Sequence, residues 1–264
     1  MKIILLTNYD FASLIALNFL MPQLANYQIL IGLSDKVGGN QKRPQALIEL
    51  AQFEHKLIQT IEDSTQAMLF SHLNDQFSAE KISSFEKISH QYQVKIIPMN
   101  DINQSRGIDW LKNFEPDLIL SIRFGKILQQ PVIDIPKLGI INLHSGLLPD
   151  YQGVMATFWA MLEGEQSIGT SLHFISDNNI DKGEIVQNSE LSLEKNKSYL
   201  HNVLALYLAG CENMLSAVNL LHAGQPLISH PQSGKARYYG FPTEQDLDKF
   251  HLMGFRLFNE KEFV

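Results

Sequence analysis

The chain has 264 residues, of which 45% are hydrophobic and 19% are charged. This composition excludes a disordered chain, and the length suffices for one large α/β domain, alone or with a small appendage. The chain has 21 Lys and Arg against 28 Asp and Glu, a net charge of −7 that argues against a large nucleic-acid-binding surface. The single cysteine, Cys211, excludes an intrachain disulfide and a cysteine-based metal cage.

The N-terminus looks like the start of a signal peptide, because Met1 and Lys2 precede an apolar run over residues 3–6. Polar residues end this run at once, so it is too short for a signal sequence, and a buried first strand is the better interpretation. No other segment has the pattern of a membrane span. We therefore expect a cytoplasmic protein without membrane contact.

Short apolar runs alternate with helical patterns along the chain. Strands are predicted over residues 2–6, 28–33, 94–97, 117–121, 139–143, 170–176 and 185–191. Helices are predicted over residues 11–21, where Pro22 is expected to end the helix, and over 44–53, 108–114, 155–162 and 199–222. Residues 54–92 have helical spacing without clear boundaries.

Strands that are apolar on both faces and separated by helices indicate a parallel sheet covered on both sides. The expected fold is therefore α/β, with a Rossmann-like, mostly parallel sheet and helices on both faces over residues 1–228. The turn-rich residues 229–264 are predicted to form a small C-terminal extension. In such sheets ligands bind where the strands end, which directs attention to the loops that follow residues 6, 120, 143 and 176.

The loop after the first strand, residues 7–11, contains no glycine. A dinucleotide-binding fold needs glycines there for close approach to a pyrophosphate, and Asp10 would repel a phosphate at the helix N-terminus. A nicotinamide or flavin enzyme is therefore not expected. Asp10 is interpreted as a helix cap.

The residues richest in chemical information lie between 140 and 153. Asn142 and His144 are two positions apart at the end of a buried strand, so their side chains share one face. Either both groups meet something polar at a site, or both bond the local backbone, and the residues alone do not decide between these interpretations.

A second polar stretch, residues 177–186, lies between two predicted strands and includes Asp181. Alone it is typical of a solvated turn, but adjacent parallel strands would bring its carboxylate beside the His144 imidazole. No metal-ligand spacing is present. The remaining histidines do not cluster in the sequence and are interpreted as structural or surface residues: His55, His72, His90, His173, His201, His222, His230 and His251.

Together these stretches resemble the folate-dependent formyltransferases, which act on methionyl-tRNA, glycinamide ribonucleotide or sugar nucleotides. The family's Asn-x-His and Leu-Leu-Pro elements match Asn142, His144 and residues 147–149, followed by Gly153. Its later Asp-x-Gly element matches residues 181–183. The resemblance covers about residues 117–190, and the three elements in order and at family spacing make it specific.

The resemblance implies transfer of a formyl group from N10-formyltetrahydrofolate to an unprotonated primary amine, without a metal. Asn142 and protonated His144 would donate hydrogen bonds to the oxyanion that forms. Asp181 would favour protonated His144 and relay the proton lost by the amine through water. No covalent intermediate is needed, and Cys211, in an apolar helix, is interpreted as a packing residue.

By position in the family, the folate would bind the loop over residues 121–128 and the backbone of residues 177–180. Arg123 and Lys126 are candidates for contact with the acidic folate tail. The predicted folate-binding residues are Phe124, Gly125, Lys126, Leu128, Ile140, Asp177, Asn179 and Ile180. The predicted acceptor-binding residues are Tyr151, Gln152 and Gly153.

Departures from family patterns narrow the choice among the acceptor classes of the family. The glycine-rich first loop of the glycinamide ribonucleotide enzymes is missing, and about forty residues after the long helix are too few for the barrel of the methionyl-tRNA enzymes. The charge of −7 also opposes a tRNA grip. The first strand starts at Lys2, without the N-terminal regulatory domain that formyltetrahydrofolate hydrolases carry.

In size the chain resembles the sugar-nucleotide N-formyltransferases, often of O-antigen biosynthesis and often dimers. We therefore expect an amino sugar on a nucleoside diphosphate as acceptor, and a homodimer. The alternatives are a methionyl-tRNA formyltransferase without the barrel and a non-catalytic folate-binding homologue. Aromatic and basic residues of the tail would either contact the nucleotide or close the core or a dimer interface: Lys235, Arg237, Tyr238, Tyr239 and Phe241.

Overall fold

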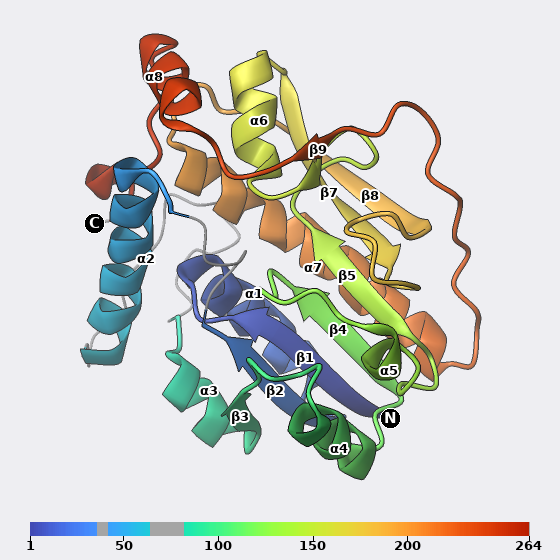
Figure 1. Cartoon of the computed structure of the whole chain (residues 1–264). Coiled ribbons are helices and arrows are strands. Elements are labelled where there is room, and N and C mark those ends of the chain that lie inside the picture. The colour runs from blue at the N-terminus through green and yellow to red at the C-terminus, as the bar shows by residue number, and fades with distance from the viewer. Residues whose placement is uncertain (36–41, 64–81, 264) are drawn as a thin grey trace.

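The structure, a computed structural model, describes residues 1–35, 42–63 and 82–263. A seven-stranded sheet forms its centre (Figure 1). In spatial order the strands are β3 (Lys95–Pro98), β2 (Gln28–Ser34), β1 (Lys2–Asn8), β4 (Leu118–Ile122), β5 (Ile140–His144), β7 (Ser167–Phe174) and β8 (Ile185–Ser192). The first five are parallel to one another, which confirms the predicted α/β fold with a mostly parallel sheet.

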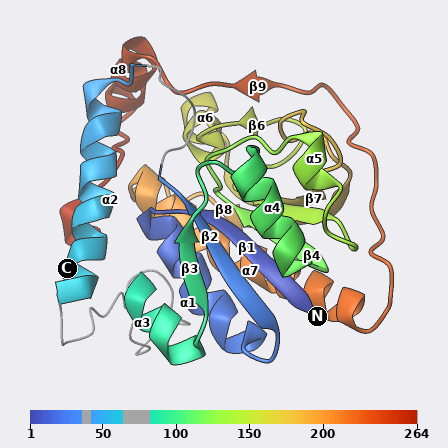
Figure 2. The same cartoon turned by 60° about the horizontal axis from the view of Figure 1, so that its bottom comes forward.

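Helices cover both faces of the sheet (Figures 1 and 2). Along β1, Ile3 and Leu5 face one hydrophobic cluster, whereas Ile4 and Leu6 face the other, and all four are fully buried. A strand with apolar residues on both faces is stable only between two such layers. The helices are α1 (Phe11–Leu24), α2 (Gln45–Asp63), α3 (Phe85–Tyr92), α4 (Ser105–Phe114), α5 (Gln130–Ile133), α6 (Ala156–Glu163), α7 (Tyr199–His222) and α8 (Glu244–Leu252).

The expectation that the strands around Asp181 are parallel to β5 is wrong. β7 is antiparallel to β5, with Asn142 paired to His173 and His144 paired to Ser171, and β8 is antiparallel to β7. After β5 the chain passes through the eight-residue α6 and does not return to the amino ends of the parallel strands, as a parallel connection would require. β7 therefore starts near the end of β5 and runs the other way.

The prediction that Pro22 ends the first helix is also wrong, because α1 continues to Leu24. A proline removes one backbone hydrogen bond, and near the end of a helix this loss interrupts few further turns. Of the stretch that had no clear boundaries, residues 54–63 complete α2 and residues 85–92 form α3, while residues 64–81, with His72, lie outside the described residues.

α7 is the one described helix that is long and apolar enough to cross a membrane by length and composition. Its N-terminal half is a core element here: Leu204, Leu206 and Tyr207 are at most 1% exposed in the main hydrophobic cluster. Cys211 is fully buried in the same helix, and burial raises the pKa of its thiol. The thiol is therefore a packing group, as predicted.

The C-terminal residues run back over the rest of the molecule (Figure 1). From the end of α7 the chain passes along β8 and across the end of the sheet as β9 (Tyr238–Tyr239), which pairs in parallel with β6 (Gln152–Gly153). Beyond β9, Leu247, Phe250 and Phe263 join the main hydrophobic cluster. The extension and the sheet thus share one core.

Because both faces of β1 are buried, its apolar side chains contribute directly to stability. We expect Leu5→Ala to lower the free energy of unfolding by about 3 kcal/mol, through lost burial and a residual cavity. Leu252→Ala is the matched control, because Leu252 is 87% exposed, and its cost should stay below about 0.5 kcal/mol. Urea unfolding of both variants measures the difference, and equal losses would contradict this description of the core.

Candidate active site

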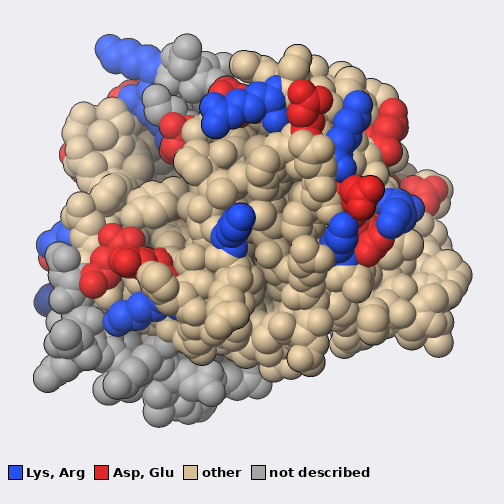
Figure 3. Space-filling model, turned by 90° about the horizontal axis from the view of Figure 1, so that it is seen from below, with Lys and Arg blue, Asp and Glu red and all other residues tan. Residues whose placement is uncertain are grey.

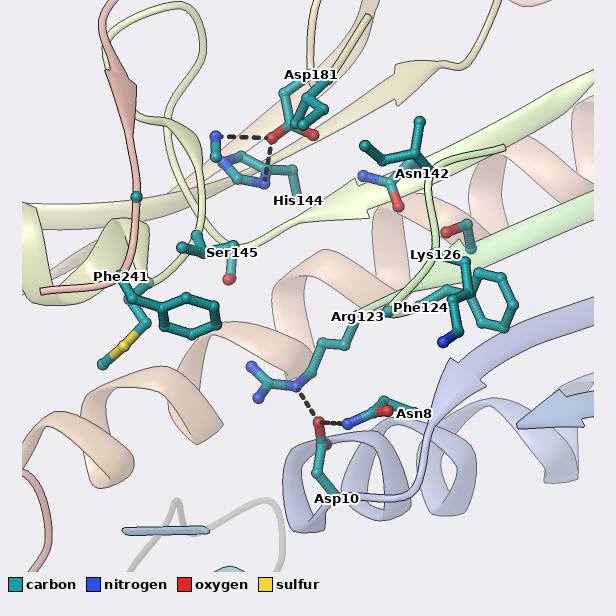
Figure 4. A pocket seen from close by; sticks show the side chains of 18 of the residues that line it. Asn8, Asp10, Arg123, Phe124, Lys126, Asn142, His144, Ser145, Asp181 and Phe241 are labelled. Atoms are coloured by element: carbon teal, nitrogen blue, oxygen red, sulfur yellow. Dashed lines mark hydrogen bonds and ion pairs between the residues drawn. The ribbon is translucent and has the colours of Figure 1, made fainter. Parts of the chain in front are cut away.

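A cavity of about 1180 Å³ opens at the carboxyl ends of the parallel strands. The loops after β1, β2, β4, β5 and β7 line it, together with α2 and the tail around β9 (Figure 4). β1 is the switch point of this sheet, because the chain proceeds to β2 on one side and later to β4 on the other. Ligands of open α/β sheets bind at such a point, and the cavity lies where the strand pattern predicted it.

Two strands bring three polar side chains to one face of the sheet. Asn142 and His144 point the same way from β5, as their spacing predicted. His173 of β7 lies directly opposite Asn142 in the antiparallel register. The Asn142 Nδ2 and His173 Nε2 atoms are 3.0 Å apart, so the two side chains form a cross-strand pair at the cavity wall.

Asp181 reaches these groups from the loop after β7. Its Oδ2 lies 3.5 Å from His144 Nδ1, and its Oδ1 lies 3.4 Å from His173 Nε2. The Gly153 N–H donates a hydrogen bond to Oδ2 at 2.9 Å. The backbone of Asp181 has a φ of 53°, in the left-handed region that few residues other than glycine adopt. Such backbone geometry is concentrated at functional sites, and here it belongs to the residue that turns its carboxylate inward.

The surroundings of Asp181 favour its charged form. Burial alone would raise the pKa of this carboxyl, but the His144 and His173 rings, when doubly protonated, and the Gly153 N–H together outweigh burial. The net result lowers the pKa of Asp181 to about 2. The cavity therefore holds a fixed negative charge beside two imidazoles.

His144 is held from both sides. Its Nε2 lies 2.7 Å from the carbonyl oxygen of Tyr151, and its Nδ1 faces Asp181. Both neighbours are oxygen acceptors, so only a doubly protonated ring donates to both at once. The backbone of the loop after β5 and the carboxylate thus fix the orientation of this imidazole.

The interpretation of His173 as an unclustered residue is wrong. Its Nδ1 lies 2.9 Å from the carbonyl oxygen of Phe174, which places the proton of a neutral ring on Nδ1. With the ring neutral, Nε2 accepts a hydrogen bond from the Asn142 amide; with the ring doubly protonated, the Nε2 N–H faces Asp181 Oδ1 instead. The missing signal was strand direction: once β7 is antiparallel, the register puts His173 opposite Asn142.

A second group of charges lines the cavity below Ser145 in Figure 4. Asp10 accepts the Ser13 N–H at 2.8 Å, which confirms that it caps α1. Asp10 Oδ2 also accepts a hydrogen bond from Arg123 Nε at 2.9 Å. The Arg123 side chain is 21% exposed and its Nε is taken up by this ion pair, so contact of the guanidinium with an acidic folate tail stays a prediction.

The residues expected to bind folate fall into two walls of the cavity. Phe124, Gly125, Lys126 and Leu128 line one side, and Asp177, Asn179 and Ile180 line another. Ile140 is not a lining residue, because it lies fully buried in the second hydrophobic cluster. Among the described residues, the backbone N–H groups of residues 126–128 have no acceptor.

The residues expected to bind the acceptor are placed differently from one another. Gly153 lines the cavity, with its N–H on Asp181. Tyr151 does not, since its hydroxyl bonds Glu163 and Glu165. Gln152 is buried beneath the Asp181 loop and donates to the Asp181 carbonyl oxygen at 3.2 Å.

The C-terminal tail contributes to the site. Gln232 Nε2 lies 2.7 Å from the carbonyl oxygen of Asp181 and 2.9 Å from that of Gly183, so the tail fixes the loop that carries the carboxylate. Further along, Tyr238 and Phe241 line the cavity, and the Arg43 guanidinium lies 4.5 Å from the centre of the Phe241 ring. Turn signals in the sequence did not indicate either contact.

In the part of the chain that the structure describes, no group of three or more His, Cys, Asp and Glu residues has an arrangement that could hold a metal ion. Around one end of the cavity lie an amide, two imidazoles and a carboxylate. Together they donate hydrogen bonds, hold a proton and stabilise a developing negative charge.

Comparison with known families identifies the class. The Formyl transferase family matches residues 1–201, and the chain belongs to that family. The methionyl-tRNA formyltransferase of Syntrophus aciditrophicus is 35% identical over 157 residues, which are 59% of this chain and 49% of that protein. The bifunctional polymyxin resistance protein ArnA of Wigglesworthia glossinidia brevipalpis is 36% identical over 129 residues, 48% of this chain and 19% of that protein. The match thus spans about half of the first relative and a fifth of the second.

Solved structures share the fold. An N-formyltransferase from Helicobacter canadensis, in complex with folinic acid and dTDP-3-aminofucose, has a TM-score of 0.56 at 16% identity, covering 93% of this chain and 71% of that one. A 4-N formyltransferase from Francisella tularensis has a TM-score of 0.59 at 12% identity, covering 94% and 86%. At these identities the likeness establishes the architecture.

The lowered pKa of Asp181 has a consequence for stability. An unfolded aspartate has a pKa of about 3.9, so a folded-state value of about 2 means that the carboxylate stabilises the fold above the unfolded value. That contribution is lost as the pH falls through the folded value. We expect the difference in unfolding free energy between wild type and Asp181→Asn to be larger at about pH 5 than at about pH 2, by about 2 kcal/mol.

Urea unfolding at several pH values measures this difference. Asp109→Asn is the matched control, because Asp109 is an exposed carboxylate on α4. Its difference from wild type should change little over the same range. If Asp181→Asn follows Asp109→Asn, the carboxylate is not held by the two imidazoles.

Proposed function

We propose that the protein transfers a formyl group from N10-formyltetrahydrofolate to the primary amine of a nucleotide-linked amino sugar. The observation that carries the proposal is the position of Asp181, whose two oxygens face His144 and His173 at the wall of the cavity. The family membership of the chain agrees with formyl transfer, and the neighbour with folinic acid and dTDP-3-aminofucose supports both substrates.

The cavity has the surfaces that a folate would need. Three apolar residues of the cavity lining come from two loops: Phe124 and Ile127 from the loop after β4, and Ile175 from the loop after β7. Ile127 is 55% exposed. An apolar wall with open backbone N–H groups at residues 126–128 suits a flat ring with polar edges. Bound there, the co-substrate would supply the formyl carbon.

In the proposed reaction the amide and imidazole stabilise charge. Asn142 uses one amide hydrogen for His173, so its second hydrogen remains for the oxygen that becomes negative as the amine attacks. His144, when doubly protonated, adds positive charge beside it. Asp181 holds that imidazolium and is the acceptor, directly or through water, for the proton that the amine loses. The bond between the formyl carbon and N10 then breaks, N10 takes up a proton, and tetrahydrofolate leaves.

His173 is a positioning residue in this proposal. The Phe174 carbonyl keeps its proton on Nδ1, and its Nε2 then orients the Asn142 amide. A neutral His173 therefore aims the amide hydrogens, rather than the amide oxygen, along the cavity wall. On the resemblance alone we add that the enzyme is a cytoplasmic homodimer of O-antigen biosynthesis.

Methionyl-tRNA is the second candidate acceptor, because the sequence relatives include many methionyl-tRNA formyltransferases. On the face seen in Figure 3, basic side chains are interspersed with acidic ones and do not form one continuous patch. A tRNA grip depends on phosphate contacts and weakens steeply with salt. Salt-dependent binding of tRNA is therefore the discriminating property.

Removing the amide tests the role of Asn142. We expect Asn142→Ala to lower kcat for formyl transfer by about 100-fold or more, because the amide acts on charge that develops in the transition state. Binding of 5-formyltetrahydrofolate, measured by calorimetry, should change little. Asn219→Ala, at an exposed position of α7, is the control and should keep normal turnover. Near-normal kcat in Asn142→Ala would remove this residue from the mechanism.

The experiment that tests the function is an acceptor screen with N10-formyltetrahydrofolate, read by mass for one added formyl group. The panel contains dTDP-, GDP- and UDP-linked amino sugars and methionyl-tRNA. We expect formylation of a sugar nucleotide. Formylation of methionyl-tRNA alone would establish the second candidate. Folate binding without any formylation would support a non-catalytic homologue and overturn the proposal.

A further inference from the structure

The N-terminus of α1 is occupied by carboxylates of the chain itself. Asp10 accepts the Ser13 N–H at 2.8 Å, and Glu54 of α2 accepts the Phe11 N–H at 3.3 Å and bonds the Ala12 N–H. In many α/β folds these N–H groups hold a phosphate of the ligand. Here that donor set is already satisfied, so a phosphate of the acceptor has no reason to bind at this end of the cavity.

A hydrogen-bonded network connects these carboxylates to the catalytic strand. Arg123 donates from Nε to Asp10, and its Nη1 lies 3.5 Å from the Tyr207 hydroxyl. The Tyr207 hydroxyl also lies within electrostatic reach of the Ser145 side chain, which directly follows His144. The group therefore lies beside the place where the amine must react, and Glu54, Asp10, Arg123 and Ser145 all line the same cavity.

Tyr199, at the start of α7, has an unused hydroxyl in this network. The residue is 5% exposed and lines the cavity, yet among the described residues its hydroxyl has no hydrogen-bond partner. Its electrostatic neighbours are Arg123, Glu54, Tyr207 and Asp10. The Tyr199 hydroxyl is not among the fully buried atoms that lack a partner, so it opens onto the cavity, where a polar ligand can bind it.

The balance of charge in this group suits a neutral ligand. Burial and the charge of Asp10 raise the pKa of Glu54 to about 7, against the opposing effect of Arg123. Near neutral pH Glu54 is therefore charged only in part, and with Asp10 it slightly outweighs Arg123, so the group does not attract a phosphate. Phenol and guanidinium donate while carboxyl oxygens accept, which is the mixed pattern that ring hydroxyls require.

We propose that Tyr199, Glu54 and Arg123 form a hydroxyl subsite that binds ring hydroxyls of the acceptor's sugar while its amine lies at His144. This rests on the proposed function, which it deepens by assigning the residues that select the sugar. The acceptor's phosphates then lie away from α1, towards the mouth of the cavity. Tyr199 is a binding residue in this proposal and takes no part in the chemical step.

The test compares two accepted nucleotide amino sugars that differ by one ring hydroxyl, with wild type and Tyr199→Phe. For the hydroxylated acceptor, we expect Tyr199→Phe to raise KM by about 3- to 10-fold at unchanged kcat. For the deoxy acceptor, KM should stay the same. Tyr27→Phe is the matched control, because the Tyr27 ring packs on His222 outside the cavity lining. If Tyr199→Phe changes KM by the same factor for both acceptors, for each hydroxyl position tried, the subsite is overturned.

A binding measurement separates this proposal from the proposed function. If no amino sugar is formylated, the function fails, and calorimetric titration of the same sugar nucleotides into wild type and Tyr199→Phe still tests the subsite. Weaker binding of the hydroxylated compounds alone would support it. Unchanged affinity, or no binding of any sugar nucleotide by wild type, would overturn it.

Discussion

The contact of one carboxylate with two imidazoles is the interaction on which the site depends. Asp181 faces His144 with one oxygen and His173 with the other, and those two rings come from neighbouring strands. Without the carboxylate, β5 and β7 would present polar groups to the cavity with nothing to neutralise them. The Asp181 carboxylate thus contacts a histidine on each of the two paired strands, and in the proposed reaction it holds the imidazolium.

Several weaker contacts hold that carboxylate in place. The left-handed backbone of Asp181 is stabilised from outside the loop, because Gln152 and Gln232 bond its carbonyl oxygen and Gly153 bonds its side chain. Gly153 is needed for geometric reasons: its φ is 100°, and a Cβ there would lie 2.1 Å from the Tyr239 carbonyl oxygen. The tail is thus part of the apparatus that positions Asp181, although residues 229–264 are distant from it in sequence.

The cavity has two chemically different ends. Around His144 and Asp181 it has fixed charge and proton-holding groups, suited to an attacking amine. Around α1, Glu54 and Asp10 occupy the helix N-terminus, so that end has hydroxyl and carboxyl groups but no phosphate site. This division explains why a fold that often binds phosphates after its first strand lacks glycines in that loop.

The sequence predicted the parallel core of the sheet, the cavity edge and the shared face of Asn142 and His144, because period-two spacing and apolar runs encode these features locally. It did not predict His173, since strand direction depends on the path of the chain through α6 and on tertiary pairing. The Asp10–Arg123 ion pair joins residues 113 positions apart and leaves no local pattern.

The placement of Tyr151 was also beyond sequence reasoning. Its neighbour Gly153 lines the cavity, but the hydroxyl of Tyr151 turns to Glu163 at the end of α6 and to Glu165 just after it. A motif gives the order of residues in a loop, whereas the direction of each side chain depends on the elements packed around it.

A double-mutant cycle for formyl transfer tests the central claim most directly. Asn142→Ala, Asp181→Asn and the double variant would be compared with wild type by kcat/KM. If the carboxylate holds the imidazoles and, through His173, the amide, these residues act as a unit. The double variant should then have a kcat/KM little below that of the less active single variant. If the fold-loss in kcat/KM of the double variant equals the product of the two single losses, Asn142 and Asp181 act independently, which would contradict this account.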